Sequence, residues 1–222
     1  MTSASPSTPA DLLAAAQLLR LASPALPIGA FAWSGGLEGA IHEGVVTDEA
    51  SAANWIGDLI LLGHGRWDAP ILWAMLTRPA QRDHLDALYL AGRETRELRA
   101  ETLQTGQSLL RLLAQLDPSR AAPRATLPRA WAEAADAWNI PATAALLGWL
   151  VATLEGQLAV LQKALPLGQV AAQRLYARLL PVVVLAHDEA RMLPEESWSS
   201  SLPGLAQLSA RHETQYSRLF RS

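Results

Sequence analysis

The residues of this chain that could carry acid–base or metal chemistry are five histidines and the carboxylates beside them. None of the histidines belongs to the paired pattern with an intervening glutamate that marks zinc proteases. The simplest interpretation is that each histidine is structural or lies on the surface. A metal-dependent enzyme could still gather His, Asp and Glu side chains in space, from three runs: His42-Glu43, His187-Asp188-Glu189 and His212-Glu213. Because the chain has no cysteine, thiolate nucleophiles, iron–sulfur clusters and cysteine-based zinc sites are excluded.

A second candidate for chemistry is Ser34, in the segment Ala32-Trp33-Ser34-Gly35-Gly36. This segment resembles a nucleophile elbow, in which a serine sits on a sharp turn after a strand. The strict pattern needs glycine at position 32, and a proline-rich segment stands where the strand should be. We therefore expect Ser34 to cap a helix over residues 35–41. A hydrolase that uses Ser34 as its nucleophile is the alternative.

The third unusual residue is Lys163, the single lysine among 18 basic residues. The formal net charge of −3 gives no general electrostatic attraction for nucleic acid or anionic lipid. The first ten residues lack the basic start and apolar stretch of a signal peptide, and the longest apolar run, 142–154, is too short to span a bilayer. We therefore expect no nucleic-acid or membrane partner and a cytoplasmic protein.

The elements that must position these residues are predicted to be helices. The chain has 222 residues, 50% of them hydrophobic and 18% charged, and its apolar residues recur at three- and four-residue spacing. No sustained alternation indicates a strand. The predicted fold class is all-α, as a single globular multi-helix bundle. Its predicted parts are a disordered segment over 1–10, an all-helical domain over 11–210 and a partner-binding tail over 211–222.

Helix boundaries are predicted from capping residues, glycines and prolines. Asp11 is expected to cap the first helix, Thr47 to cap the second, and Gly63 with Gly65 to end it. Pro181 is expected to kink or split the last long helix. The predicted helices cover 12–22, 48–62, 69–77, one or two helices within 81–115, 142–164, a helix ending near 192 and a short one within 205–220, and a long loop covers 117–129.

A charged run and the tryptophans could serve either structure or binding. Residues 93–101 hold six charges in nine positions, and Arg93 is placed to pair with Glu97 on one helical face. That face is expected to be solvated, and the alternative is a surface that binds a partner. The eight tryptophans are expected in the core, and any that face solvent would mark an interface.

Five segments in chain order carry a resemblance to a known family. Residues 23–38, SPALPIGAFAWSGGLE, resemble the proline- and glycine-rich signature of the urease accessory protein UreF family. The other matches are Val46-Thr47-Asp48, Arg93-Glu94-Thr95 with Glu101 and Gly106, Lys163-Ala164-Leu165-Pro166-Leu167-Gly168-Gln169 and the ending Tyr216–Ser222.

The resemblance implies an all-α homodimer that has no cofactor and no catalytic activity of its own. It implies a scaffold that bridges a UreD-type accessory protein, also called UreH, and a UreG-type GTPase. The assembly would couple GTP hydrolysis to the delivery of nickel to apo-urease.

The resemblance also implies which residues make the contacts. We expect one set to contact the GTPase: Lys163, Pro166, Gly168 and Gln169. We expect a second set to contact the UreD-type partner: Phe31, Trp33, Tyr216, Arg218, Phe220, Arg221 and Ser222. The tail is polar apart from Leu219 and Phe220, so it is expected to become ordered only when the partner binds. The alternative is a tail packed on its own domain.

Overall fold

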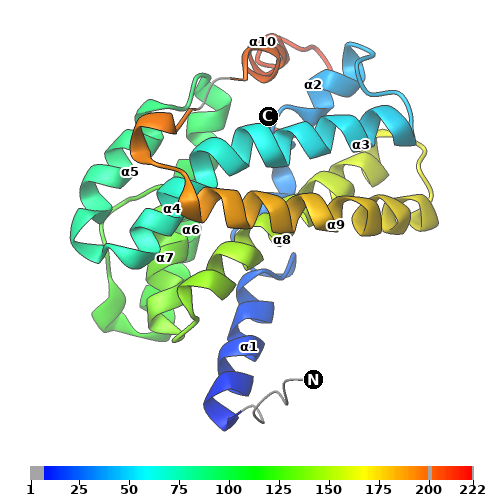
Figure 1. Ribbon diagram of the computed structural model, residues 1–222. Coiled ribbons are helices and arrows are strands. Elements are labelled where there is room, and N and C mark those ends of the chain that lie inside the picture. Colours follow the sequence, from blue (N-terminus) through cyan, green and yellow to red (C-terminus); the bar gives the residue numbers. More distant parts are fainter. Residues whose placement is uncertain (1–7, 200–201, 222) are drawn as a thin grey trace.

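A computed structural model describes residues 8–199 and 202–221, and every regular element within them is helical (Figure 1). This confirms the predicted all-α class. The α-helices, in chain order, are α1 (Pro9–Leu21), α2 (Leu37–His42), α3 (Glu49–Asp58), α4 (Ala69–Thr77), α5 (Arg82–Ala91), α6 (Arg96–Leu116), α7 (Leu127–Ala137), α8 (Ala142–Ala164), α9 (Gln169–Met192) and α10 (Pro203–His212). Short η elements join several of them.

The first helix begins earlier than the sequence predicted. Thr8 caps α1: its hydroxyl accepts from the backbone N–H of Asp11, and the Asp11 carboxylate accepts from the backbone N–H of Thr8. Asp11 is thus the third helical residue of a capping box and not the cap. The part of the predicted disordered segment over residues 1–7 lies outside the described residues. Figure 1 shows α1 projecting from the body of the molecule, on the side away from α10.

The helix predicted to stop at Gly63 and Gly65 does not stop there. α3 runs directly into a π-helical segment, η2 (Leu59–Asp68), which continues into α4. A side chain at position 65 would lie 3.3 Å from the Cβ of Ala186 on α9, so the glycine permits close helix packing. The wider π-turns are frequent at functional sites, and this one places His64 and Asp68 in the interior.

The charged run 93–101 is divided by a helix boundary. Thr95 caps α6, and its hydroxyl accepts from the backbone N–H of Leu98. Arg93 therefore precedes the helix and cannot form the predicted helical pair with Glu97. The region 81–115 forms two helices, α5 and α6. The long loop that follows contains the turn η4 (Pro118–Arg120) and ends where α7 begins.

Two long helices form the centre of the core. α8 has the predicted bounds, and α9 packs along it (Figure 1). Pro181 lies inside α9 without splitting it. By length and composition α8 could cross a membrane, but 56% of its most apolar window is buried in the fold, as expected of a core helix. All eight tryptophans are buried or half-buried, so none marks an exposed interface.

The C-terminal segment packs against the start of α2 and α6. α10 lies beside α2, where the backbone oxygen of Leu208 approaches within 3.0 Å of a Cβ built at Gly39. Only a residue without a side chain allows this approach. The chain then turns out of the helix and returns over the surface, so that Phe220 enters the core cluster. Residues 213–221 are called the C-terminal tail below.

Candidate functional site

The structure brings together residues that the sequence assigned to two different partners. The Nζ atom of Lys163, in the last turn of α8, lies 5.9 Å from the ring centre of Phe31 and 5.5 Å from that of Phe220. Phe31 belongs to the short helix η1 (Ala30–Ala32) and Phe220 to the tail. An ammonium group at this distance from two aromatic rings is attracted by their negative faces. Lys163 is therefore part of the same surface as the tail.

A second cation–aromatic pair extends this surface. The guanidinium carbon of Arg221 lies 5.9 Å from the ring of Trp33, and the backbone N–H of Arg221 donates to the carbonyl of Ala32 over 2.8 Å. Trp33 is buried, whereas Phe31 is 71% exposed. We call the five side chains Phe31, Trp33, Lys163, Phe220 and Arg221 the cation–aromatic cluster. The cluster joins η1, α8 and the tail.

The remaining residues predicted to contact the UreD-type partner belong to the same tail. Tyr216 is fully exposed, and Leu219 is 69% exposed. Arg218 reaches back to the Glu97 carboxylate at 2.7 Å. Phe220, predicted as an anchor for a partner, is only 7% exposed and is a member of this chain's own core. Ser222 lies outside the described residues.

The rest of the set predicted for the GTPase lies on the turn between α8 and α9. Pro166, Gly168 and Gln169 are exposed there. Gly168 begins α9 as its cap, with extended backbone. Lys163 is the member of the set that connects this turn to the cation–aromatic cluster.

Sequence reasoning missed a buried ionic network beneath the tail. The two ring nitrogens of His212 face two carboxylates, Nδ1 at 2.8 Å from Glu97 and Nε2 at 3.0 Å from Glu38. Glu38 also accepts backbone N–H groups from Leu219 over 2.7 Å and Phe220 over 2.9 Å. We call Glu38, Glu97 and His212 the tail clamp. One indication of this network was present in the sequence: Glu97 belongs to the charged run 93–101, for which a solvated face was not the only interpretation.

Each member of the clamp lies at a helix end. Glu38 and Glu97 lie in the first turns of α2 and α6, and His212 lies in the last turn of α10. Helix N-termini favour anions and C-termini favour cations. With Arg218, the network holds two carboxylates and two basic side chains. The buried charges are thereby paired, as burial requires.

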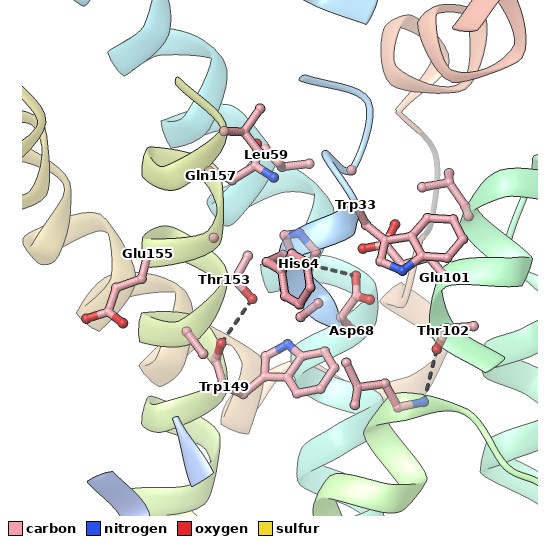
Figure 2. A pocket seen from close by; sticks show the side chains of 18 of the residues that line it. Trp33, Leu59, His64, Asp68, Glu101, Thr102, Trp149, Thr153, Glu155 and Gln157 are labelled. Carbon is pink, nitrogen blue, oxygen red and sulfur yellow. Dashed lines mark hydrogen bonds and ion pairs between the residues drawn. The ribbon is translucent and has the colours of Figure 1, made fainter. Parts of the chain in front are cut away.

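A cleft of about 260 Å³ reaches from the cation–aromatic cluster into the molecule. Figure 2 shows it between α8, η2, α6 and the Trp33 segment. Trp149 and Thr153 line it on the α8 side, and His64 and Asp68 point toward one another from η2. Trp131 also lines the cleft and meets Trp149 edge-to-face at 5.3 Å. The lining is therefore mostly apolar and aromatic, with a charged group of residues from η2 and the adjoining Arg93, and with the separate carboxylates of Glu101 and Glu155.

That charged group is centred on Asp68. Its carboxylate lies 3.1 Å from the Arg93 guanidinium and 3.1 Å from His64 Nδ1, and it accepts a hydrogen bond from the Tyr89 hydroxyl. This pairing replaces the predicted contact between Arg93 and Glu97. Burial alone would raise the pKa of Asp68, but the Arg93 charge and the His64 ring outweigh it and hold that pKa well below its usual range. Burial and the adjacent carboxylate raise the pKa of Tyr89.

These shifts indicate what the group can do chemically. A carboxylate with a strongly lowered pKa stays ionised and is a poor proton acceptor, and a tyrosine with a raised pKa stays neutral. Three partners also occupy the Asp68 oxygens. The arrangement thus suits structural charge pairing better than general acid–base catalysis.

The alternative enzyme sites were a serine nucleophile and a gathered metal site. Ser34 is fully buried, and its Oγ accepts the backbone N–H of Glu38 over 3.3 Å, near the start of α2, whose cap is Gly36. His187 faces Asp188 and the Thr143 carbonyl. Within residues 8–199 and 202–221, no three His, Asp or Glu side chains gather in a way that could hold a metal ion.

The fold and this site define an all-helical protein that carries a surface of cations and aromatic rings next to a folded-back tail. The UreF family model matches residues 46–180. The chain is 49% identical to the urease accessory protein UreF of Azoarcus sp. strain BH72, over 95% of this chain and 97% of that protein. It is 45% identical to the UreF of Dechloromonas aromatica, over 93% and 97%, and 47% identical to that of Ectopseudomonas mendocina, over 92% and 97%. The chain belongs to the UreF family.

Proposed function

We propose that this protein is a urease maturation factor that works through protein contacts and has no catalytic activity. It bridges a UreD-type accessory protein and a UreG-type GTPase, and couples GTP hydrolysis to nickel delivery to apo-urease in the cytoplasm. The cation–aromatic cluster carries this proposal. Lys163, from the set predicted for the GTPase, lies near the rings of Phe31 and Phe220, from the set predicted for the UreD-type partner, and this supports a scaffold that holds the two partners close together.

The UreD-type partner is assigned to the exposed side of the tail. Phe31, Tyr216 and Leu219 are exposed, and Phe31 lies beside the positive charge of Lys163. Aromatic residues with arginine are the composition of binding hot spots. A partner surface with apolar side chains and acidic neighbours would complement it.

The GTPase is assigned to the turn between α8 and α9, with Lys163 at its edge. Lysine offers a compact point charge, which suits a phosphate-facing or acidic surface. The homodimer is assigned to α1, which projects from the body of the molecule on the side away from α10 (Figure 1). Exposed leucines on α1 support such a contact: Leu12, Leu13 and Leu19.

Size-exclusion chromatography with light scattering tests the proposal. The purified protein is expected at twice the chain mass, and co-expression with both partners is expected to give one larger complex. Lys163→Ala is expected to reduce GTPase retention at least tenfold, because the cation is lost while the fold is kept. Arg120→Ala, in the exposed η4 turn, is the control. A monomer that retains neither partner, or a Lys163→Ala protein that retains the GTPase normally, would contradict the proposal.

A further inference from the structure

We infer that the cleft beside α8 binds a small, neutral, mostly apolar molecule that carries a hydrogen-bond acceptor such as a carbonyl oxygen. This site goes beyond the partner contacts proposed above and does not depend on them. Its evidence is the lining of the cleft and the buried N–H groups around it that have no acceptor among the residues that the structure describes.

The size and lining of the cleft define the body of the ligand. Its volume is about 260 Å³, and an engineered cavity of about 150 Å³ in another protein holds benzene, so a molecule of two fused rings fits here. Aromatic rings contribute much of the wall: Trp67, Tyr89, Trp131 and Trp149. Such walls favour a flat apolar guest, because rings stack with an offset or meet edge to face. A few polar groups in a site of this kind fix the orientation of the ligand.

Three buried N–H groups at the cleft lack an acceptor. They are the indole Nε1 atoms of Trp67 and Trp149 and the Nε atom of Arg93. Trp149 is 7% exposed and Trp67 is 9% exposed. Buried polar groups in proteins almost always have a partner, yet within residues 8–199 and 202–221 none of these three has one. An acceptor bound in the cleft would supply the missing bonds.

The neighbouring tryptophan, Trp131, has the acceptor that Trp149 lacks. The Trp131 indole donates to the carbonyl of Ala145 over 3.0 Å. Its ring centre lies 5.3 Å from that of Trp149, which fixes the Trp149 ring in the wall. Figure 2 shows the Trp149 nitrogen on the side of its ring that faces Thr153 and His64, across the cleft.

The charges at the cleft favour a neutral ligand. The Arg93 guanidinium is already paired with Asp68 at 3.1 Å. Burial raises the pKa of the Glu155 carboxyl group in the lining, and the same desolvation would oppose a bound anion. A cation could not accept the N–H groups, and no cluster of His, Asp and Glu in the described part of the chain could hold a metal ion. A neutral molecule with an acceptor oxygen meets each of these conditions.

Binding of Prodan to the purified full-length protein tests the site. Prodan is a neutral naphthalene with a ketone oxygen, and its fluorescence shifts to the blue in apolar surroundings. The matching dimethylaminonaphthalene lacks the ketone and reports the contribution of the rings alone. We expect both to bind one to one, with Prodan the tighter, at a dissociation constant of about 100 μM or lower.

Three variants separate the hydrogen bond from the apolar contact. Trp149→Phe removes the N–H group and keeps a ring, so it should weaken Prodan binding about three- to tenfold and affect the ketone-free molecule less. Trp55→Phe is the matched control, because the Trp55 N–H also lacks an acceptor among the described residues but is not part of the lining. Thr153→Phe fills the cleft from α8 and should abolish binding of both molecules. Thermal unfolding reports whether each variant keeps its fold.

Saturable binding that Trp149→Phe weakens for Prodan more than for the ketone-free molecule, with Trp55→Phe unchanged, supports the site whether or not Thr153→Phe folds. No saturable binding in the natural protein overturns it. An equal loss for both molecules in Trp149→Phe, or the same loss in Trp55→Phe, also overturns it. Retention of the two protein partners is measured on the same samples. A protein that retains both partners but binds no Prodan overturns the site and leaves the proposed function standing.

Discussion

Replacing Asp68 with asparagine should destabilise the fold strongly while leaving its shape nearly unchanged. The Asp68 side chain is 4% exposed and that of its partner Arg93 is 13% exposed, at 3.1 Å. The substituted amide would keep the volume and could keep a bond to Tyr89, but the Arg93 charge would lose its counter-ion. Breaking a buried pair from one side costs about 3–5 kcal/mol. Because an asparagine can still bond to Arg93, we expect a loss at the lower end of that range, about 3 kcal/mol.

Urea unfolding followed by tryptophan fluorescence measures this change, since all eight tryptophans lie in or against the core. For a chain of this size the same loss lowers the Tm by roughly 6–12 °C. Asp83→Asn is the matched control: it breaks an ion pair with Arg129 at 2.8 Å, but Asp83 is 99% exposed. Such a pair is worth about 1 kcal/mol or less. A loss at Asp68 no larger than that at Asp83 would refute the argument.

The same substitution predicts a pH dependence. The pKa of Asp68 is lower in the folded protein than in the unfolded chain. The contribution of the Asp68 carboxylate to the free energy of unfolding is therefore complete above the pKa of the unfolded chain, about 4. It is lost as the pH falls from there toward the lower pKa of the folded protein. The stability difference between the natural protein and Asp68→Asn should narrow below about pH 4 and stay constant above about pH 5. A difference that stays constant down to about pH 2.5 would contradict the assignment.

Two further predictions concern the tail and the helix contacts. Removing residues 213–222 deletes the buried Phe220, so it should lower the free energy of unfolding in urea by about 1.5–3 kcal/mol. The far-ultraviolet circular dichroism should stay nearly unchanged, and retention of the UreD-type partner should be abolished. Loss of the whole helical signal would instead show that the tail is needed for folding. Gly106→Ala should lower the free energy of unfolding by about 1–3 kcal/mol, because the new Cβ would lie 2.5 Å from the carbonyl oxygen of Ala125. Gly156→Ala, in open space on α8, should raise it by up to about 1 kcal/mol. Equal effects of the two substitutions would contradict the packing argument.

Local features of the sequence determined the class of the fold and several of its helices. α4 and α8 have the predicted bounds, since prolines mark their limits and apolar spacing runs between them. The resemblance found in five segments led to the correct family. These properties depend on neighbouring residues, and so they could be predicted without the fold.

The tertiary structure decided which distant residues meet. Gly63 and Gly65 are residues that often end a helix, but here the helix continues through both, and α9 packs closely against Gly65. Arg93 forms an ion pair with Asp68 on η2, and the two partners of His212, Glu38 and Glu97, belong to α2 and α6. Such partners are far apart in the chain, and no periodicity relates them.

At the candidate site, too, some features could be predicted from the sequence and others depend on the tertiary structure. Lys163 and the tail could be singled out from residue types and order. That they share one surface, with Phe220 turned inward and Tyr216 and Leu219 outward, depends on where α8 ends relative to the folded-back chain. Sequence sets which side chains can bind; the packing of helices sets which of them remain exposed to do so, because burial in one contact removes a side chain from another.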